Sequence, residues 1–202
     1  MILRKFLLLS FMLIMPSCLW ALPLLYQEGT DYTVISKEPS KGNEVIEFFS
    51  YNCPHCFHFD PVISEYLAQK PDTVKFERIS VGFGRPVWTM SAEAHLFIKA
   101  LGREEALHPK IFQKRQTDNS PFMNKKDVKA FLLANGVSEE EFNKAQSAMP
   151  ELMRASEMAA AKYKITSVPS IVVGGKYQVV NPGGLDSKRL SKLLAYLTKL
   201  KS

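Results

Sequence analysis

The chain has 202 residues, of which 46% are hydrophobic and 23% are charged. This length and apolar content suit one large domain, or a domain with an insertion, around a substantial core. The formal charge of +6 is dispersed, and short basic runs such as Lys125-Lys126 are typical of solvated helix faces, so nucleic acid is not an expected partner. Three cysteines are too few for a scaffold held together by disulfides.

Residues 1–21 are predicted to be a secretory signal peptide. A basic start at Arg4 is followed by an apolar run and then by a small residue, Ala21, after which cleavage is expected. The apolar run is too short to span a bilayer comfortably. Cys18 leaves a second interpretation open, in which the chain is lipidated there and anchored to a membrane. Either form of export implies an oxidising compartment, in which a dithiol can be held as a disulfide.

The segment 22–82 has the strand, helix and strand order that produces parallel strands. Apolar and β-branched residues predict the strands, which are residues 32–36, 45–50 and 74–81. Between the last two, residues 53–70 predict a helix with Pro54 in its first turn, where a missing N–H group costs nothing. Pro61 is expected to kink this helix, because a proline removes one backbone hydrogen bond.

Residues 83–150 show only helical patterns and are predicted to form an insertion. Apolar residues at helical spacing predict helices over 88–101 and 124–135, each followed by a glycine. Ser138 with Glu141 three residues later predicts a capping box at the start of another helix.

Residues 151–202 return to mixed structure. A helix is predicted over 151–163, and strands over 170–173 and 176–180 read as a hairpin joined at Gly174-Gly175. Asp186 is expected to cap a final helix with a leucine stripe. The sequence therefore predicts an α/β protein, with a mixed sheet flanked by helices and interrupted by an all-helical insertion.

Cys53-Pro54-His55-Cys56 lies where a predicted strand passes into a predicted helix. The unpaired N–H groups and the dipole of a helix N-terminus favour an anion, and the thiolate is the reactive form of cysteine. The spacing lets the two sulfurs close into a disulfide. The motif is therefore interpreted as a redox dithiol, in which Cys53, nearer the helix start, is the nucleophile.

Glu47 is unusual within its predicted strand. Alternation along the strand places this acid on the same face as Val45 and Phe49. Buried carboxylates are costly and usually have partners. Arg78 in the next predicted strand faces the same side as Phe76, so it is the expected partner.

Three segments and the helical insertion closely resemble the bacterial DsbA thiol:disulfide oxidoreductases, which have a thioredoxin-like fold. The segments are residues 44–56, Ser167-Val168-Pro169-Ser170 and Asn181-Pro182-Gly183-Gly184. The Pro-His pair between the cysteines is specific, because thioredoxins proper usually carry Gly-Pro there. The resemblance covers residues 26–200. It implies a discontinuous thioredoxin-like domain of residues 22–82 and 151–202, interrupted by 83–150, and a periplasmic location.

The resemblance also implies a mechanism. A substrate thiolate attacks Cys53 of the oxidised pair, Cys56 leaves, and a second substrate thiol resolves the mixed disulfide. His55 is implied as a cationic or hydrogen-bonding partner of Cys53, and Glu47 as a proton acceptor or electrostatic tuner beneath the dithiol. Val168 is implied to pair its backbone with a substrate peptide. The peptide bond between Val168 and Pro169 is implied to be cis.

By the same resemblance, the substrates are reduced or unfolded exported proteins. No cofactor is expected apart from the Cys53–Cys56 disulfide, and a DsbB-type, quinone-linked membrane protein is implied as the partner that reoxidises it.

Three alternative functions fit parts of the same pattern. A disulfide isomerase or reductase of the same superfamily is one, and a non-enzymatic peptide-binding chaperone is another. The third is a zinc site formed by Cys53, Cys56 and His58, but no second Cys-x-x-Cys motif supports it. His95 and His108 are interpreted as packing or surface residues.

Overall fold

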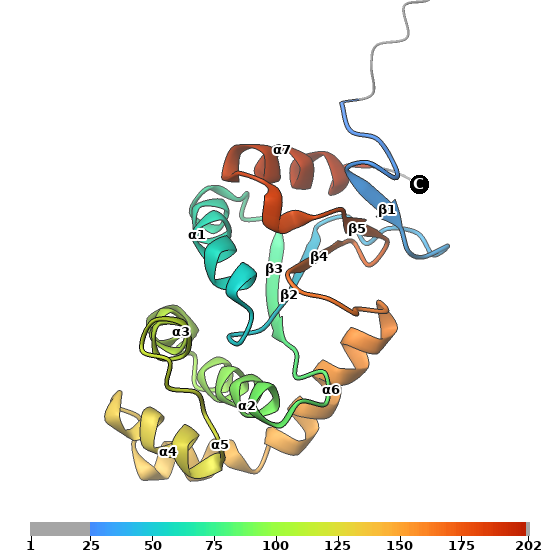
Figure 1. Cartoon of the computed structure of the whole chain (residues 1–202). Coiled ribbons are helices and arrows are strands. Elements are labelled where there is room, and N and C mark those ends of the chain that lie inside the picture. Colours follow the sequence, from blue (N-terminus) through green and yellow to red (C-terminus); the bar gives the residue numbers. More distant parts are fainter. Residues whose placement is uncertain (1–24, 201–202) are drawn as a thin grey trace, which may run out of the picture.

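The computed structural model of the chain describes residues 25–200. The predicted signal peptide, with Cys18, lies outside the described residues. Within residues 25–200, one mixed five-stranded sheet carries helices on both faces, and the other helices form a lobe beside it (Figure 1). The predicted α/β architecture with a helical insertion is confirmed. No helix in the described part of the chain is long and apolar enough to cross a membrane.

The strand order of the sheet is β1-β5-β4-β2-β3. The strands are β1 (Tyr32–Val34), β2 (Glu44–Phe49), β3 (Lys75–Ser80), β4 (Ser170–Val173) and β5 (Tyr177–Val179). Strands β2 and β3 are parallel, as the connecting helix requires, and the other neighbours are antiparallel. The β4–β5 hairpin turns at Gly174 and Gly175, which have φ values of +59° and +67°. A Cβ at Gly174 would collide with Ser40 Oγ and lie 3.0 Å from the Gly42 backbone nitrogen, and with the positive φ this favours glycine there.

Seven α-helices lie within residues 25–200. They are α1 (Pro54–Gln69), α2 (Pro86–Ala100), α3 (Glu104–Phe112), α4 (Lys125–Ala134), α5 (Glu139–Gln146), α6 (Met149–Lys162) and α7 (Ser187–Leu197). Helix α3 continues directly into a π-helical turn, η1 (Gln113–Thr117), and a 3₁₀ turn, η2 (Pro182–Gly184), precedes α7. The capping box of Ser138 and Glu141 and the cap at Asp186 are confirmed. Helix α1 runs through Pro61 without a break.

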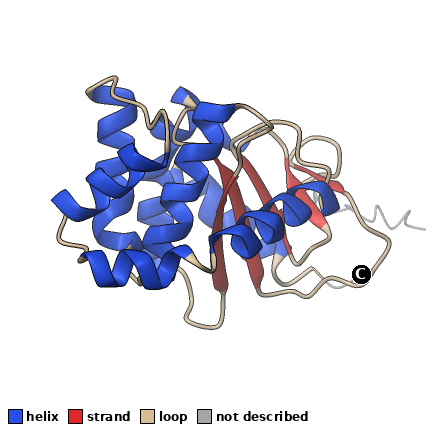
Figure 2. Ribbon diagram, turned by 90° about the horizontal axis from the view of Figure 1, so that it is seen from below, coloured by secondary structure: helices blue, strands red, loops and turns tan. Residues whose placement is uncertain are grey.

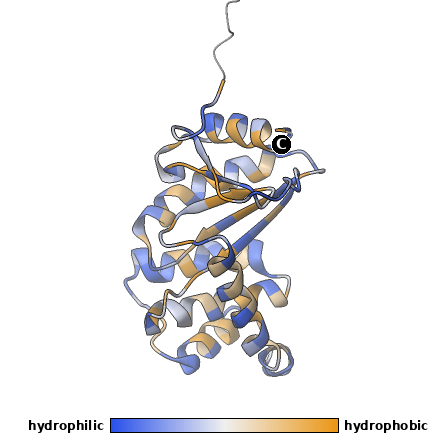
Figure 3. Ribbon diagram, turned by 90° about the vertical axis from the view of Figure 1, so that its right-hand side faces the viewer, coloured by the Kyte–Doolittle hydropathy of each residue, from blue (hydrophilic) through white to orange (hydrophobic). Residues whose placement is uncertain are grey.

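Apolar side chains cover both faces of the sheet. On one face, Val45 and Ile171 pack with Ile63 of α1 and Leu194 of α7. The leucine stripe of α7 faces this cluster, and Figure 3 shows apolar and polar residues alternating around the helix. On the other face, Phe48 and Val172 pack with the C-terminal half of α6.

A third apolar cluster fills the helical lobe, which lies to one side of the sheet (Figure 2). Its members include Phe97 and Phe142, whose rings stack with centroids 4.7 Å apart. The two cysteines of the motif belong to this cluster, so the dithiol is packed against the helical lobe. Helix α6 begins at Met149, and its N-terminal half joins the same cluster. One helix thus packs on both the lobe and the sheet.

We expect Leu194→Ala to destabilise the protein by about 2–5 kcal/mol, because it leaves a cavity under α7 at a side chain with 0% exposure. The exposed neighbour Lys192 provides the control, and Lys192→Ala should change stability by less than about 0.5 kcal/mol. Urea denaturation of both variants measures the effect. Equal losses would mean that α7 is not packed as described.

Candidate active site

Cys53 is the N-cap residue of α1. Its backbone is extended, with φ −97° and ψ 113°, and its Sγ accepts a hydrogen bond from the backbone N–H of Cys56 at 3.4 Å. The backbone N–H of Cys53 donates to Ser50 O at 3.0 Å, which closes the turn before the helix. Cys53 is 6% exposed and Cys56 is 1% exposed. The structure therefore joins the two cysteines in one turn and buries both, Cys56 more completely than Cys53.

The two thiols have opposite acid–base properties. The pKa of Cys53 is lowered to about 6, chiefly by a hydrogen bond from the Cys56 thiol. Burial opposes this shift, while the backbone N–H groups of Cys56 and His55 and the charge of His55 favour the Cys53 thiolate. The same hydrogen bond, together with burial, raises the pKa of Cys56. Near neutral pH, Cys53 is therefore the thiolate and Cys56 retains its proton.

Val168 and Pro169 lie beside the nucleophile. The Val168 carbonyl oxygen is 3.5 Å from Cys53 Sγ, and the Val168–Pro169 peptide bond is cis. Both residues are half-buried and, with the exposed His55, line a groove of about 550 Å³. Gly183 also lines the groove, close to the Pro169 ring. His55, Val168 and Pro169 thus line one groove beside Cys53, and Pro54 is exposed next to His55.

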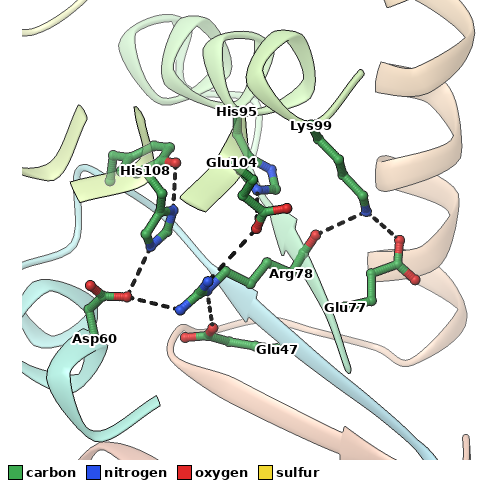
Figure 4. A network of polar contacts seen from close by, with 9 residues as sticks. Glu47, Asp60, Glu77, Arg78, His95, Lys99, Glu104 and His108 are labelled. Atoms are coloured by element: carbon green, nitrogen blue, oxygen red, sulfur yellow. Dashed lines mark hydrogen bonds and ion pairs between the residues drawn. The ribbon is translucent and has the colours of Figure 1, made fainter. Parts of the chain in front are cut away.

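A buried charge network lies on the α1 side of the sheet (Figure 4). Glu47 is 2% exposed and pairs with Arg78, its register partner on β3, through an Nε–Oε2 distance of 3.1 Å. The same guanidinium lies 3.2 Å from Asp60 Oδ1 and 3.8 Å from Glu104 Oε1. Arg78 thus forms ion pairs with three carboxylates. Burial raises the pKa of Glu47 to about 7, because Arg78 compensates its charge only in part and Asp60 and Glu104 repel it.

Two histidines extend this network into the helical lobe. His108 Nε2 is 2.9 Å from Asp60 Oδ1, and its Nδ1 is 2.7 Å from the hydroxyl of Tyr51. His95 Nε2 is 3.4 Å from Glu104 Oε1. Burial lowers the pKa of both rings, that of His95 to about 4, so both are neutral near pH 7. Both rings are buried, as packing residues are, but no residue pattern indicated that they also join the Arg78 network.

His95, Glu104 and His108 also have ligand atoms within 4.8 Å of one another, a spacing that suits a metal ion. The Arg78 guanidinium already places a positive charge beside Glu104, which disfavours a second cation. The side chain of His58 is exposed, and within residues 25–200 it forms no such group with the two cysteines. The arrangement of the cysteines therefore indicates thiol chemistry rather than a zinc centre.

The fold and the dithiol define a thioredoxin-like redox protein, and comparisons with known proteins identify the family. A sequence model of the DSBA-like thioredoxin domain matches residues 44–197. The chain is 33% identical over 165 residues to the thiol:disulfide interchange protein DsbA of Haemophilus influenzae, covering 79% of each chain. It is also 33% identical over 137 residues to that of Pseudomonas syringae pv. tomato, covering 67% of this chain and 64% of the relative.

Solved structures agree with the sequence comparison. The structure of Proteus mirabilis DsbA with a non-covalently bound peptide superposes with a TM-score of 0.78 at 27% identity, covering 87% of this chain and 99% of that chain. The chain belongs to the DSBA-like thioredoxin domain family and is a thiol:disulfide oxidoreductase.

We expect alkylation of the reduced protein at pH 6–7 to modify Cys53 much faster than Cys56. Cys53 has the pKa of about 6, whereas Cys56 stays protonated and buried. Mass spectrometry of the labelled peptides measures the two rates. Cys53→Ser supplies the control, in which labelling at Cys56 should remain slow. Equal rates, or a faster Cys56, would refute Cys53 as the nucleophile.

Glu47→Gln tests the buried carboxyl. Because the pKa of Glu47 rises from an ordinary 4.5 to about 7, this group stabilises the fold below pH 4.5 and loses that effect as pH rises through 7. We expect the unfolding free energy of the variant, minus that of wild type, to increase by about 2–3 kcal/mol across this window. Urea titrations of the oxidised proteins measure it, since the cysteines then do not titrate. A flat difference would place the pKa of Glu47 near its ordinary value.

Proposed function

We propose that the chain is an oxidase, which donates the Cys53–Cys56 disulfide to reduced, newly exported proteins. The observation that carries this proposal is the asymmetry of the two thiols, with Cys53 favoured as a thiolate and Cys56 as a protonated thiol. A protein that stabilises its reduced form in this way makes its disulfide a stronger oxidant. DsbA is itself a well-known example of this relation.

The proposed reaction proceeds in two exchanges. A substrate thiolate attacks Cys53 Sγ, the Cys53–Cys56 bond breaks, and Cys56 leaves and takes up a proton. A second substrate thiolate then attacks the substrate sulfur of the mixed disulfide, and Cys53 leaves as a thiolate. The substrate loses two electrons to the dithiol. A low pKa makes Cys53 the better leaving group in the second exchange.

The surrounding residues are proposed to assist each exchange. His55 contributes positive charge and a backbone N–H group to the Cys53 thiolate. Glu47 raises the pKa of Cys56 through its charge, and its own pKa of about 7 suits a group that exchanges protons near neutral pH. Pro54 presents His55 and Cys56 from the first turn of α1, where a proline costs no hydrogen bond.

Substrate peptides are proposed to bind in the groove beside Cys53. Val168 and Pro169 line it, and the backbone of Val168 is positioned to pair with an extended chain. Main-chain pairing tolerates many sequences, which suits an enzyme for unfolded proteins. The peptide complex of Proteus mirabilis DsbA supports this substrate class.

We propose a periplasmic location, following removal of residues 1–21, and reoxidation by a DsbB-type, quinone-linked membrane protein. The basic, apolar and small-residue order of the N-terminal segment supports export. Family membership supports the redox partner. The mass of the protein recovered from cells separates cleavage after Ala21 from lipidation at Cys18.

The oxidase proposal predicts that reduction stabilises the fold. We expect the reduced protein to melt at a higher temperature than the oxidised protein near neutral pH, because a strongly oxidising disulfide destabilises its own protein. Most structural disulfides do the opposite, adding about 2–4 kcal/mol. Paired thermal melts, with and without a reductant, measure the difference.

The pH dependence of this gap follows from Cys53. Its pKa is about 6 in the folded protein and about 8.5 in an unfolded chain. The stability it adds to the reduced form is complete above pH 8.5 and is lost as pH falls through 6, so the gap should narrow over that range. A clearly more stable oxidised form would indicate a structural or reductase-like dithiol. A chaperone would keep its full activity after Cys53→Ala and Cys56→Ala together, whereas an oxidase would lose it.

A further inference from the structure

The helical lobe holds the loop that leads into the nucleophile. Asn52 precedes Cys53 and is 6% exposed, with its side chain inserted between α2 and η1. Its Nδ2 donates to Ser91 Oγ of α2 at 2.8 Å. Its Oδ1 accepts from Arg115 Nε at 2.6 Å. Both hydrogen-bonding ends of this buried amide are therefore bound by the lobe, and one of the bonds is charge-assisted.

The partners on η1 come from an unusual piece of backbone. Residues Gln113–Thr117 form a π-helical turn, in which the N–H of Asp118 reaches Gln113 O at 3.0 Å. Such turns are rare and frequently lie at functional sites. Gln116 Nε2 donates to Tyr51 O at 2.6 Å, next to the contact that Arg115 makes. The turn therefore directs two consecutive side chains onto the two residues before Cys53.

Arg115 is itself oriented from its other side. Its Nη1 donates to Asn119 Oδ1 at 3.1 Å, so the guanidinium is held at two points. The backbone turn from Ser50 to Cys53, which Arg115 contacts at Asn52, is tight. The N–H of Asn52 donates to Ser50 Oγ at 3.2 Å, and the N–H of Cys53 donates to Ser50 O at 3.0 Å. A displacement of Asn52 must therefore move the backbone of Cys53.

We propose that Arg115 is a positioning residue for the nucleophile, which it holds in register with the start of α1 by way of Asn52. This inference rests on the proposed redox function. The bond from the Cys56 N–H to Cys53 Sγ is 3.4 Å long and depends on where the Cys53 backbone lies. Releasing Asn52 loosens that backbone and weakens the stabilisation of the thiolate.

Arg115→Met removes the donors and keeps the length of the side chain. We expect it to raise the pKa of Cys53 and to reduce the oxidising strength of the disulfide about tenfold in the equilibrium constant with glutathione, which corresponds to about 30 mV. Thiolate absorbance against pH measures the pKa, and equilibration in glutathione buffers measures the potential. Arg115→Lys retains the charge and one donor, so it should restore part of both values.

Asn52→Ala separates positioning from charge, because it removes the contact and leaves Arg115 in place. Asn52→Ala should shift the Cys53 pKa and the reduction potential in the same direction as Arg115→Met does. The variant that carries both substitutions should shift them by less than the sum of the two single effects. Arg103→Met is the matched control. Arg103 also makes two hydrogen bonds inside the lobe, to Gly136 O at 3.0 Å and to Glu141 Oε1 at 2.9 Å, without touching the loop before Cys53. It should lower the melting temperature and leave both redox values unchanged.

Two results would overturn the proposal. One is a destabilised Arg115→Met protein with an unchanged Cys53 pKa and potential. The other is a shift in Arg115→Met that Asn52→Ala does not share, because the charge would then act on Cys53 directly. If Arg115→Met does not fold, Asn52→Ala carries the same test. Failure of the oxidase function would be seen separately, in a wild-type protein that does not oxidise a reduced substrate.

Discussion

The site depends on one hydrogen bond, in which the sulfur of Cys53 caps the N-terminus of α1. Cys53 is the N-cap of α1 and its Sγ accepts the N–H of Cys56, the third helical residue; serine, threonine and aspartate usually occupy this capping position. An uncharged thiol accepts weakly there, whereas a thiolate accepts strongly and is also favoured by the helix dipole. Chemistry at the sulfur and local stability of α1 are therefore coupled. The fold places the strand, the turn and the lobe so that this one interaction is maintained.

The buried charges beneath the dithiol give a second constraint. Arg78 lies between Glu47, Asp60 and Glu104, so the side-chain charges around it are not balanced when all three acids are ionised. Neutral histidines line the lobe side of the network and add no positive charge. Such a site resists additional negative charge and favours a proton on Glu47 or Cys56. It thus supports the division of roles between the two cysteines.

The sequence was sufficient where local rules decide the structure. The caps at Ser138 and Asp186 were predictable because they depend on neighbours three residues away. The pairing of Glu47 with Arg78 followed from alternation along two parallel strands. By contrast, the contact of Arg115 with Asn52 joins residues 63 positions apart and depends on a π-turn that no residue pattern announces. The sharing of Arg78 with Glu104 likewise depends on how the lobe packs on the sheet.

Helix α6 links the helical lobe mechanically to the sheet. Its first half is packed in the helical lobe and its second half on the sheet, where the ring of Tyr163, just after the helix, meets that of Phe48. A rigid rod fixed at both ends acts as a brace, so the two parts of the protein cannot rock apart without shearing an apolar contact. The dithiol, which packs against the lobe while α1 packs on the sheet, then keeps a fixed position between the two parts. When an unfolded polypeptide binds, the polypeptide therefore changes its conformation to fit the site, because its chain is flexible and the site is not.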